Sequence, residues 1–326
     1  MKAVLICAAM SMLLSATLSL AWGADRGSRV PAEKPSDRWE AMPEAPENVE
    51  VVSDVTYGTG SNRDLKLVLF LPKDDKRTHP GVVFLHGGGW TGGSPAQFYR
   101  QATYLATKGY VGACVEYRLS GEAKFPAAVE DVKCAVRWMR ANAEKYRIDP
   151  NRIASVGGSA GAHLASMLGV MDKDDNLEGT GGHAGESSKT NAVVAFNGAF
   201  DFTALTDHMK GVSEKTGNPT APERFIGGSI EEVPEKYRQA APITYVDGKD
   251  APHLFLHGTA DALVPIKQSA DMMKALQEAG VRAELYEAEG ESHGFFNKGP
   301  QYDKTLKRME KFLNEVFEWG PAKVER

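Results

Sequence analysis

The sequence contains only three cysteines among 326 residues. Cys7 lies in an apolar stretch at the N-terminus, so only Cys114 and Cys134 belong to the rest of the chain. No spacing of cysteine and histidine resembles that of a zinc site. Cys114 and Cys134 could form a disulfide or stay as buried thiols, because sequence alone does not show whether their Cα atoms come close enough.

The sequence also lacks a long run of basic residues. Its formal net charge is -5 at pH 7, whereas nucleic acids and anionic membranes bind proteins with clustered positive charge. We therefore expect neither of them as a partner. The acidic residues 171–176 lack the twelve-residue ligand pattern of a calcium loop and are interpreted as a solvated loop.

One long hydrophobic run is present, at residues 3–20 after Met1 and Lys2. Small residues at 21 and 23 and a polar shift at 24–26 are typical of a cleavable signal peptide. The alternative is an uncleaved anchor, since about 18 apolar residues can just span a bilayer. We expect residues 1–23 to be a signal peptide that exports the protein to the periplasm or the medium. Residues 24–48, rich in Pro, Glu and Ala, are expected to form a flexible linker.

From residue 49 to about 320, strand and helix patterns alternate. Runs such as 81–85 are typical of strands buried on both faces, and residues 94–108 follow a helical pattern. This alternation predicts the α/β class, with a mostly parallel, doubly wound sheet flanked by helices. The segments at about 172–190 and 202–250 do not follow this alternation of strands and helices. We expect them to form a small cap, because loops this long are usually lids.

Residues 154–165 combine a strand, a tight turn with a serine at its centre and an apolar helix. The sequence G-x-S-x-G in this context is typical of a nucleophile elbow, whose strained serine needs small neighbours. The pattern predicts Ser159 as a nucleophile. The alternative is a small-residue turn that only joins the strand to the helix.

A serine hydroxyl needs a general base, usually a histidine that is oriented by an acid. In one common arrangement the three residues follow in the order Ser, Asp or Glu, His. Asp261 follows the predicted strand at 253–256, and His293 follows the one at 283–287. We therefore predict Asp261 as the orienting acid and His293 as the base.

Each of these assignments has an alternative interpretation. Asp261 could instead cap the helix that opens near Pro265, and the fallback acids are then Glu287, Glu289 and Glu291. His293 could be an ordinary loop histidine, but it is the only one after the last predicted strand. Among the other histidines, we expect His163 to be packed and His257 to anchor its own loop.

The sequence His-Gly-Gly-Gly at residues 86–89 follows the predicted strand at 81–85. Acyl transfer places negative charge on a carbonyl oxygen, and each donor fixed at that position contributes about 3 kcal/mol. Glycines let backbone N–H groups converge without a side chain in the way. We predict that Gly88, Gly89 and Ala160 form an oxyanion hole and that His86 is structural. The alternative is a flexible glycine turn.

The HGGG loop, the G-x-S-A-G elbow, the H-G-T-x-D loop at 257–261 and the late S-H-G-F follow one another in order. Together they resemble the hormone-sensitive-lipase-like esterases of the α/β-hydrolase superfamily. Residues 117–119, 125–132 and 157–164 are also similar to bacterial carbohydrate esterases that remove acetyl or feruloyl groups from plant polysaccharides. The resemblance implies an α/β-hydrolase fold with a small cap, no cofactor and no metal, and an acyl-enzyme at Ser159.

One departure favours the acetyl and feruloyl esterases. Many hormone-sensitive-lipase relatives carry an acidic residue before the nucleophile, where this chain has Gly158. We therefore expect a serine carboxylesterase for short-chain or aromatic acyl esters, with Trp90 and Phe295 as walls of the acyl pocket. The natural ester and the oligomeric state stay open.

Four other functions fit the sequence less well. Residues 172–190 are too polar for the apolar cap of a long-chain lipase, although a short-chain lipid esterase stays possible. A prolyl-oligopeptidase needs a large extra domain for which the chain has no room. Export disfavours an arylformamidase, and a catalytically inactive binding protein usually lacks a triad residue, whereas all three are present here.

Overall fold

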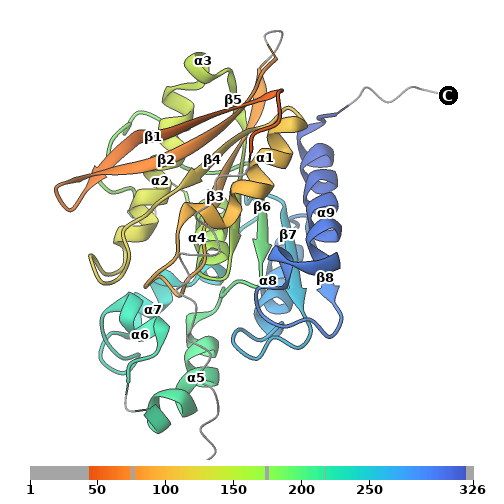
Figure 1. Ribbon diagram of the computed structural model, residues 1–326. Helices are drawn as coiled ribbons and strands as arrows, with labels where there is room; N and C mark the ends of the chain where they lie inside the picture. Colours follow the sequence, from red (N-terminus) through yellow and green to blue (C-terminus); the bar gives the residue numbers. More distant parts are fainter. Residues whose placement is uncertain (1–43, 75–77, 173–175, 217, 321–326) are drawn as a thin grey trace, which may run out of the picture. The chain divides into compact units, whose positions relative to one another are not determined.

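A mixed eight-stranded sheet forms the centre of the protein (Figure 1). The computed structural model describes residues 44–74, 78–172, 176–216 and 218–320, so the predicted signal peptide and most of the predicted linker lie outside the described residues. The strand order is β1-β2-β4-β3-β5-β6-β7-β8, in which β1 pairs antiparallel with β2, β2 antiparallel with β4, and all later neighbours are parallel. The strands are β1 Val49–Gly60, β2 Arg63–Pro72, β3 His79–Leu85, β4 Val111–Val115, β5 Ile148–Gly158, β6 Ala192–Phe196, β7 His253–Gly258 and β8 Ala283–Ala288.

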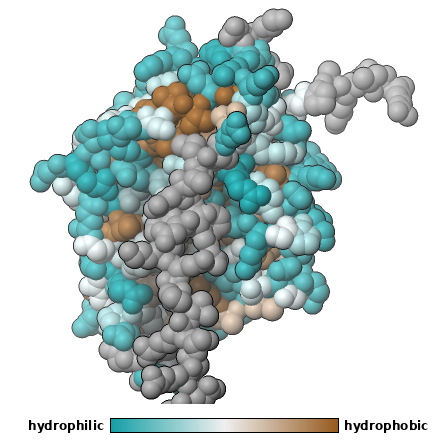
Figure 2. Space-filling view, in the orientation of Figure 1, coloured by the Kyte–Doolittle hydropathy of each residue, from teal (hydrophilic) through white to brown (hydrophobic). Residues whose placement is uncertain are grey.

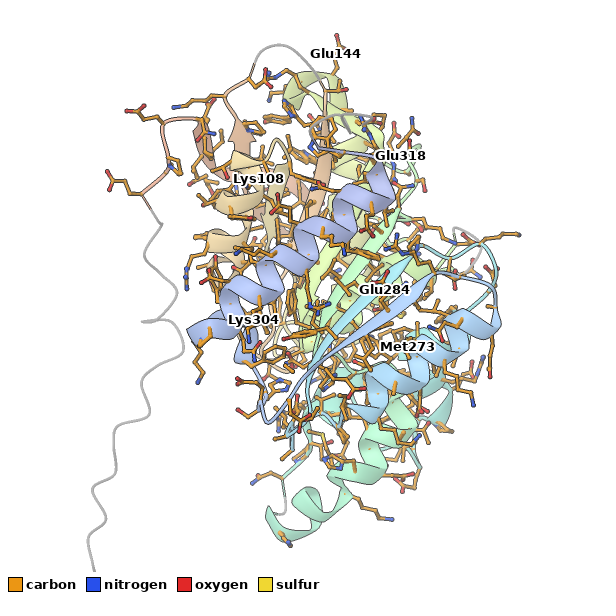
Figure 3. All side chains as sticks on the ribbon, turned by 90° about the vertical axis from the view of Figure 1, so that its right-hand side faces the viewer. Lys108, Glu144, Met273, Glu284, Lys304 and Glu318 are labelled. Carbon is orange, nitrogen blue, oxygen red and sulfur yellow. The ribbon has the colours of Figure 1, made fainter. Side chains whose placement is uncertain are left out.

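Helices cover both faces of this sheet, which confirms the predicted α/β class. Helices α1 (Tyr99–Thr107) and α9 (Gly299–Phe317) pack on one face, and α2 (Ala127–Ala141), α4 (Ala160–Val170) and α8 (Lys267–Glu278) pack on the other. Figure 3 shows α9, between Lys304 and Glu318, and α8, which carries Met273, on either side of the strand with Glu284. The parallel part of the sheet is therefore buried between two helical layers.

Alternate residues of one strand enter different hydrophobic clusters. In β3, Val83 and Leu85 face the layer with α2 and α4, while Val82 and Phe84 face the layer with α1 and α9. This follows from the two-residue period of a strand. It explains why residues 81–85 are apolar throughout rather than alternating with polar residues.

The predicted helices start and end at somewhat different residues. The stretch predicted as one helix at 94–108 begins with a 3-10 turn, Pro95–Phe98, and continues as α1. Helix α2 ends at Ala141, and Asn142 separates it from the short α3 (Ala143–Tyr146). In the described part of the chain, no helix combines the length and apolar character that a membrane span requires.

Three helices follow β6 and lie together at one end of the sheet (Figure 1). They are α5 (Phe202–Thr216), α6 (Ala221–Ile226) and α7 (Pro234–Ala240), and all fall within the segment 202–250. A backbone hydrogen bond of 2.9 Å from Phe125 N to Phe225 O joins α6 to the body. Figure 2 shows that the described surface on this face is mostly hydrophilic, with a few hydrophobic patches. Among the described residues, Leu263 is the large hydrophobic residue with an exposed side chain, at 48%.

The segment 172–190 has a different position. Its described residues dock on α2 through Glu178, which pairs with Lys133 and Arg137, and through Gly182 O, which accepts from Arg137 Nε at 3.0 Å. The segment then enters β6 at the amino end of that strand. The described residues of this segment lie beside α2 and not at the sheet edge that carries Ser159, whereas we expected the segment to form part of a cap.

Candidate active site

Ser159 lies at the turn between β5 and α4 in a strained backbone conformation. Its φ is 54° and its ψ is -118°, a combination that is uncommon for a residue with a side chain. The Ser159 N–H donates to Phe196 O at 2.8 Å, which ties the turn to the end of β6. A Cβ atom on Gly161 would lie 2.0 Å from Leu85 O. Only glycine at this position lets α4 start so close to β3.

His293 connects Ser159 to Asp261. Its Nε2 is 2.9 Å from Ser159 Oγ, and its Nδ1 is 2.7 Å from Asp261 Oδ2. The Asp261 side chain is fully buried, whereas that of His293 is 23% exposed. With a proton on Nδ1, the ring donates to the carboxylate and accepts from the serine hydroxyl. The structure therefore brings the three predicted residues together in the order that proton transfer from serine requires.

The carboxylate of Asp261 receives hydrogen bonds on both oxygens. Oδ1 accepts from the N–H groups of Leu263 and Val264 at 3.0 and 2.9 Å, so Asp261 also caps the turn that follows it. Burial alone would raise the pKa of Asp261, but the hydrogen bonds from His257 and His293 and the charge of His293 hold it well below its usual value. The group stays a carboxylate, able to orient the imidazole.

His257 anchors its loop as predicted, and it also contacts the acid. Its Nδ1 is 2.7 Å from Ser269 Oγ and its Nε2 is 2.9 Å from Val264 O. The same Nε2 lies 3.3 Å from Asp261 Oδ2, on the oxygen that faces His293. The contact with Asp261 was not predicted, although both residues belong to one H-G-T-x-D motif.

The glycine loop after β3 leaves two backbone donors free. Among the residues that the structure describes, the N–H groups of Gly88 and Gly89 have no hydrogen-bond partner, whereas Gly87 N donates to Gln97 Oε1 at 2.6 Å. Ala160 is the first residue of α4, where a helix has no internal acceptor for its N–H. Three free donors therefore come from the two turns that the sequence singled out.

His86 supports this loop from within. Its Nδ1 lies 2.8 Å from Gly87 O, and its ring stacks on Tyr117 with 4.3 Å between centroids. The Tyr117 hydroxyl donates to His86 O at 2.7 Å. Burial lowers the pKa of His86 to about 4, so the ring is neutral at pH 7. These contacts agree with the structural role expected for His86.

Trp90 and Phe295, which we expected to line the acyl pocket, are almost completely buried. They are 3% and 2% exposed and belong to the hydrophobic core. Trp90 stacks on Phe225 of α6 at 4.8 Å, and its Nε1 donates to His163 Nδ1 at 3.1 Å. His163 is packed as expected, and burial lowers its pKa to about 3. The indole thus joins the glycine loop to the helices after β6.

The two cysteines of the body are free thiols, both buried. Burial raises the pKa of Cys114 well above its usual value, so this thiol is not a nucleophile at pH 7. No cluster of three or more histidine, cysteine, aspartate or glutamate side chains suited to a metal ion occurs within the described ranges.

One residue near His293 was missed by the sequence analysis. Asn197 directly follows β6, and its Nδ2 lies 3.2 Å from His293 Nδ1 and 3.4 Å from His293 Nε2. The only signal in the sequence was its position, immediately after a buried strand at the edge where α/β sites form.

Comparison with known proteins identifies a family and its curated relatives. The BD-FAE family profile matches residues 67–276. Esterase LipC of Mycobacterium tuberculosis is 31% identical over 241 residues, which cover 73% of this chain and 58% of that protein. The chain spans about three fifths of the length of the curated relatives that it matches first.

Solved structures of esterases share this fold over most of the chain. A thermophilic esterase from Thermogutta terrifontis is 32% identical, with a TM-score of 0.71 over 88% of this chain and 99% of that one. A truncated carbohydrate esterase from gut microbiota is 27% identical, with a TM-score of 0.71 over 83% of this chain and 98% of that one. The fold is therefore that of the α/β-hydrolases, and the homologues are carboxylic ester hydrolases.

Proposed function

The chain belongs to the BD-FAE family of α/β-hydrolase esterases, and on that premise we propose that it is a serine carboxylesterase with Ser159 as nucleophile. The observation that carries the proposal is the continuous hydrogen-bonded path from Ser159 Oγ through His293 to Asp261, with steps of 2.9 and 2.7 Å. The strained turn at Ser159 supports it further, because such strain persists where function needs it.

The geometry supports a two-step reaction. Ser159 Oγ attacks the ester carbonyl while His293 Nε2 takes the hydroxyl proton, and Asp261 stabilises the imidazolium that forms. The N–H groups of Gly88, Gly89 and Ala160 hold the negative carbonyl oxygen of the tetrahedral intermediate. His293 then gives its proton to the leaving alcohol, which leaves an acyl-enzyme at Ser159. A water molecule, deprotonated by His293, hydrolyses that ester by the same steps.

We propose short-chain or aromatic acyl esters, above all acetyl or feruloyl groups on plant-type polysaccharides, as substrates. Structures of the Thermogutta terrifontis esterase carry bound propionate and bound butyrate, and a similar structure is described as a carbohydrate esterase from gut microbiota. Polysaccharides lie outside the cell, which fits the export predicted from residues 1–23. A short-chain lipid esterase is the alternative.

The test is a set of initial rates on p-nitrophenyl acetate, butyrate and octanoate and on methyl ferulate, with acetylated xylan in parallel. The protein starts at Ala24, and Ser159→Ala is the control. We expect fast turnover of acetate or ferulate, acetate release from xylan, and loss of each in the control. A preference for octanoate would favour the lipid esterase, and no turnover of any ester would refute the esterase function.

A further inference from the structure

We propose that Asn197 is a positioning residue for His293, whose side-chain amide holds the imidazole in the plane that joins Asp261 to Ser159. The proposal rests on the esterase function proposed above, because it concerns the same histidine. It adds a fourth side chain to the predicted group of three.

The contact between the amide and the ring has an unusual geometry. Asn197 Nδ2 is almost equally far from the two ring nitrogens, at 3.2 and 3.4 Å. Both nitrogens already have partners at shorter distances, Asp261 Oδ2 at 2.7 Å and Ser159 Oγ at 2.9 Å. The hydrogen-bonding directions of both nitrogens, which lie in the plane of the ring, are therefore already taken. The amide lies against the face of the ring instead. A group on that face opposes rotation of the ring away from the plane in which it contacts Asp261 and Ser159.

The backbone of Asn197 is fixed to the elements that carry the other two residues. The carbonyl of the preceding residue, Phe196, accepts from Ser159 N–H at 2.8 Å, and Asn197 N–H donates to Leu256 O at 2.9 Å. Leu256 lies in β7, which leads to Asp261. The amide thus keeps its place relative to both the nucleophile and the acid, as a positioning group must.

One further feature of Asn197 is typical of a functional residue. Its φ of 40° lies in the left-handed region that asparagine tolerates, as at the exposed Asn62. Its side chain, however, is fully buried, yet Oδ1 has no hydrogen-bond partner in the part of the chain that the structure describes. An unpartnered buried acceptor is costly, and such acceptors persist mainly where the site requires them.

The amide restrains the ring without adding a charge to the site. The charged group that faces the ring is Asp261, with His257 beyond the same carboxylate. Asn197 is neutral and acts on the ring through its dipole and its bulk.

Asn197→Gly tests the proposal, because glycine adopts a positive φ without strain. We expect kcat on p-nitrophenyl acetate to fall about tenfold with KM nearly unchanged, since only the orientation of the base is lost. The matched control is Asn62→Gly, an exposed asparagine with φ 60° in the β1–β2 turn, which should leave both quantities unchanged.

A second variant covers the case in which Asn197→Gly does not fold. Asn197→Asp keeps the shape and places a carboxylate against the ring, so the acid limb of the kcat/KM profile should move to higher pH. Wild-type kcat in folded Asn197→Gly, or an unshifted acid limb in folded Asn197→Asp, would overturn the positioning role. An inactive wild-type enzyme would instead refute the esterase function, so the two failures are distinguishable.

Discussion

Gly158, directly before the nucleophile, has no room for a side chain. A Cβ atom at this position would lie 2.5 Å from Phe296 Cζ. The Phe296 ring cannot easily move away, because it is 2% exposed and stacks on Phe196 at 4.4 Å between centroids and on Phe98 at 5.7 Å. The acidic residue found here in many hormone-sensitive-lipase relatives is therefore sterically incompatible with this core.

A double-mutant cycle tests this account of Gly158. Gly158→Ala should lower the free energy of unfolding by about 1–3 kcal/mol, because the added methyl group overpacks the site. Phe296→Leu should cost a similar amount through lost packing. The double variant should cost clearly less than the sum, since the smaller side chain vacates the space. Urea unfolding of the four proteins measures the coupling, and strictly additive costs would show that Phe296 is not the obstacle.

The role of Asp261 can be separated from that of the nearby glutamates. Asp261→Asn keeps the shape but replaces the carboxylate that accepts from His293 Nδ1, so kcat on p-nitrophenyl acetate should fall about 10³-fold or more. Glu291→Gln, a matched change on the His293 loop, should leave kcat within about twofold. Full activity of Asp261→Asn would move the acid role to Glu287, Glu289 or Glu291.

Helix α2 presents three basic residues, Lys133, Arg137 and Arg140, to the segment 172–190. Lys133 Nζ lies 2.8 Å from Glu178 Oε1, and Arg137 pairs with the other oxygen of Glu178. Arg140 donates to the carbonyls of Ser187 and Lys189. The side chains of Lys133 and Arg137 are almost completely buried. The described residues of a segment that we expected to form part of a cap are thus held along the length of a helix.

Removing the Glu178 charge tests this attachment. Glu178→Gln leaves two buried cations without a carboxylate, and we expect the free energy of unfolding to fall by about 3 kcal/mol. Glu144→Gln, the same change at an exposed residue of α3 labelled in Figure 3, should cost less than about 0.5 kcal/mol. Urea midpoints provide the comparison. Equal midpoints for the two variants would show that the paired charges do not hold the segment.

At the scale of the whole molecule, the sequence predicted what depends on local pattern. The order of strands and helices follows from runs such as 81–85, and Ser159, Asp261 and His293 could be singled out because each follows a recognisable strand. Asn197 also follows a strand, but no motif around it marks a contact with His293, which lies 96 positions away. The docking of 172–190 and the burial of Trp90 likewise depend on partners that are distant in sequence, which no local periodicity encodes.

Buried histidines predict a loss of stability in mild acid. Burial lowers the pKa of His86 and of His253 to about 4 and that of His163 to about 3. In the unfolded chain a histidine titrates at about 6.5. Below about pH 6 the unfolded chain therefore binds three protons that the folded protein does not, and each favours unfolding as the pH falls.

Asp250 has the opposite effect. Burial raises its pKa to about 6, so the folded protein binds its proton before the unfolded chain does, at about 3.9. Together these four groups take up about two protons on unfolding near pH 5.5, and their contribution to the free energy of unfolding should fall by on the order of 4 kcal/mol between pH 7 and pH 5. Urea titrations at pH 7, 6 and 5 measure this, and proton uptake during unfolding at pH 5.5 checks its cause. Equal stability at pH 7 and pH 5 would contradict the neutral, buried state of these three histidines. A large loss without proton uptake would place its origin in other groups.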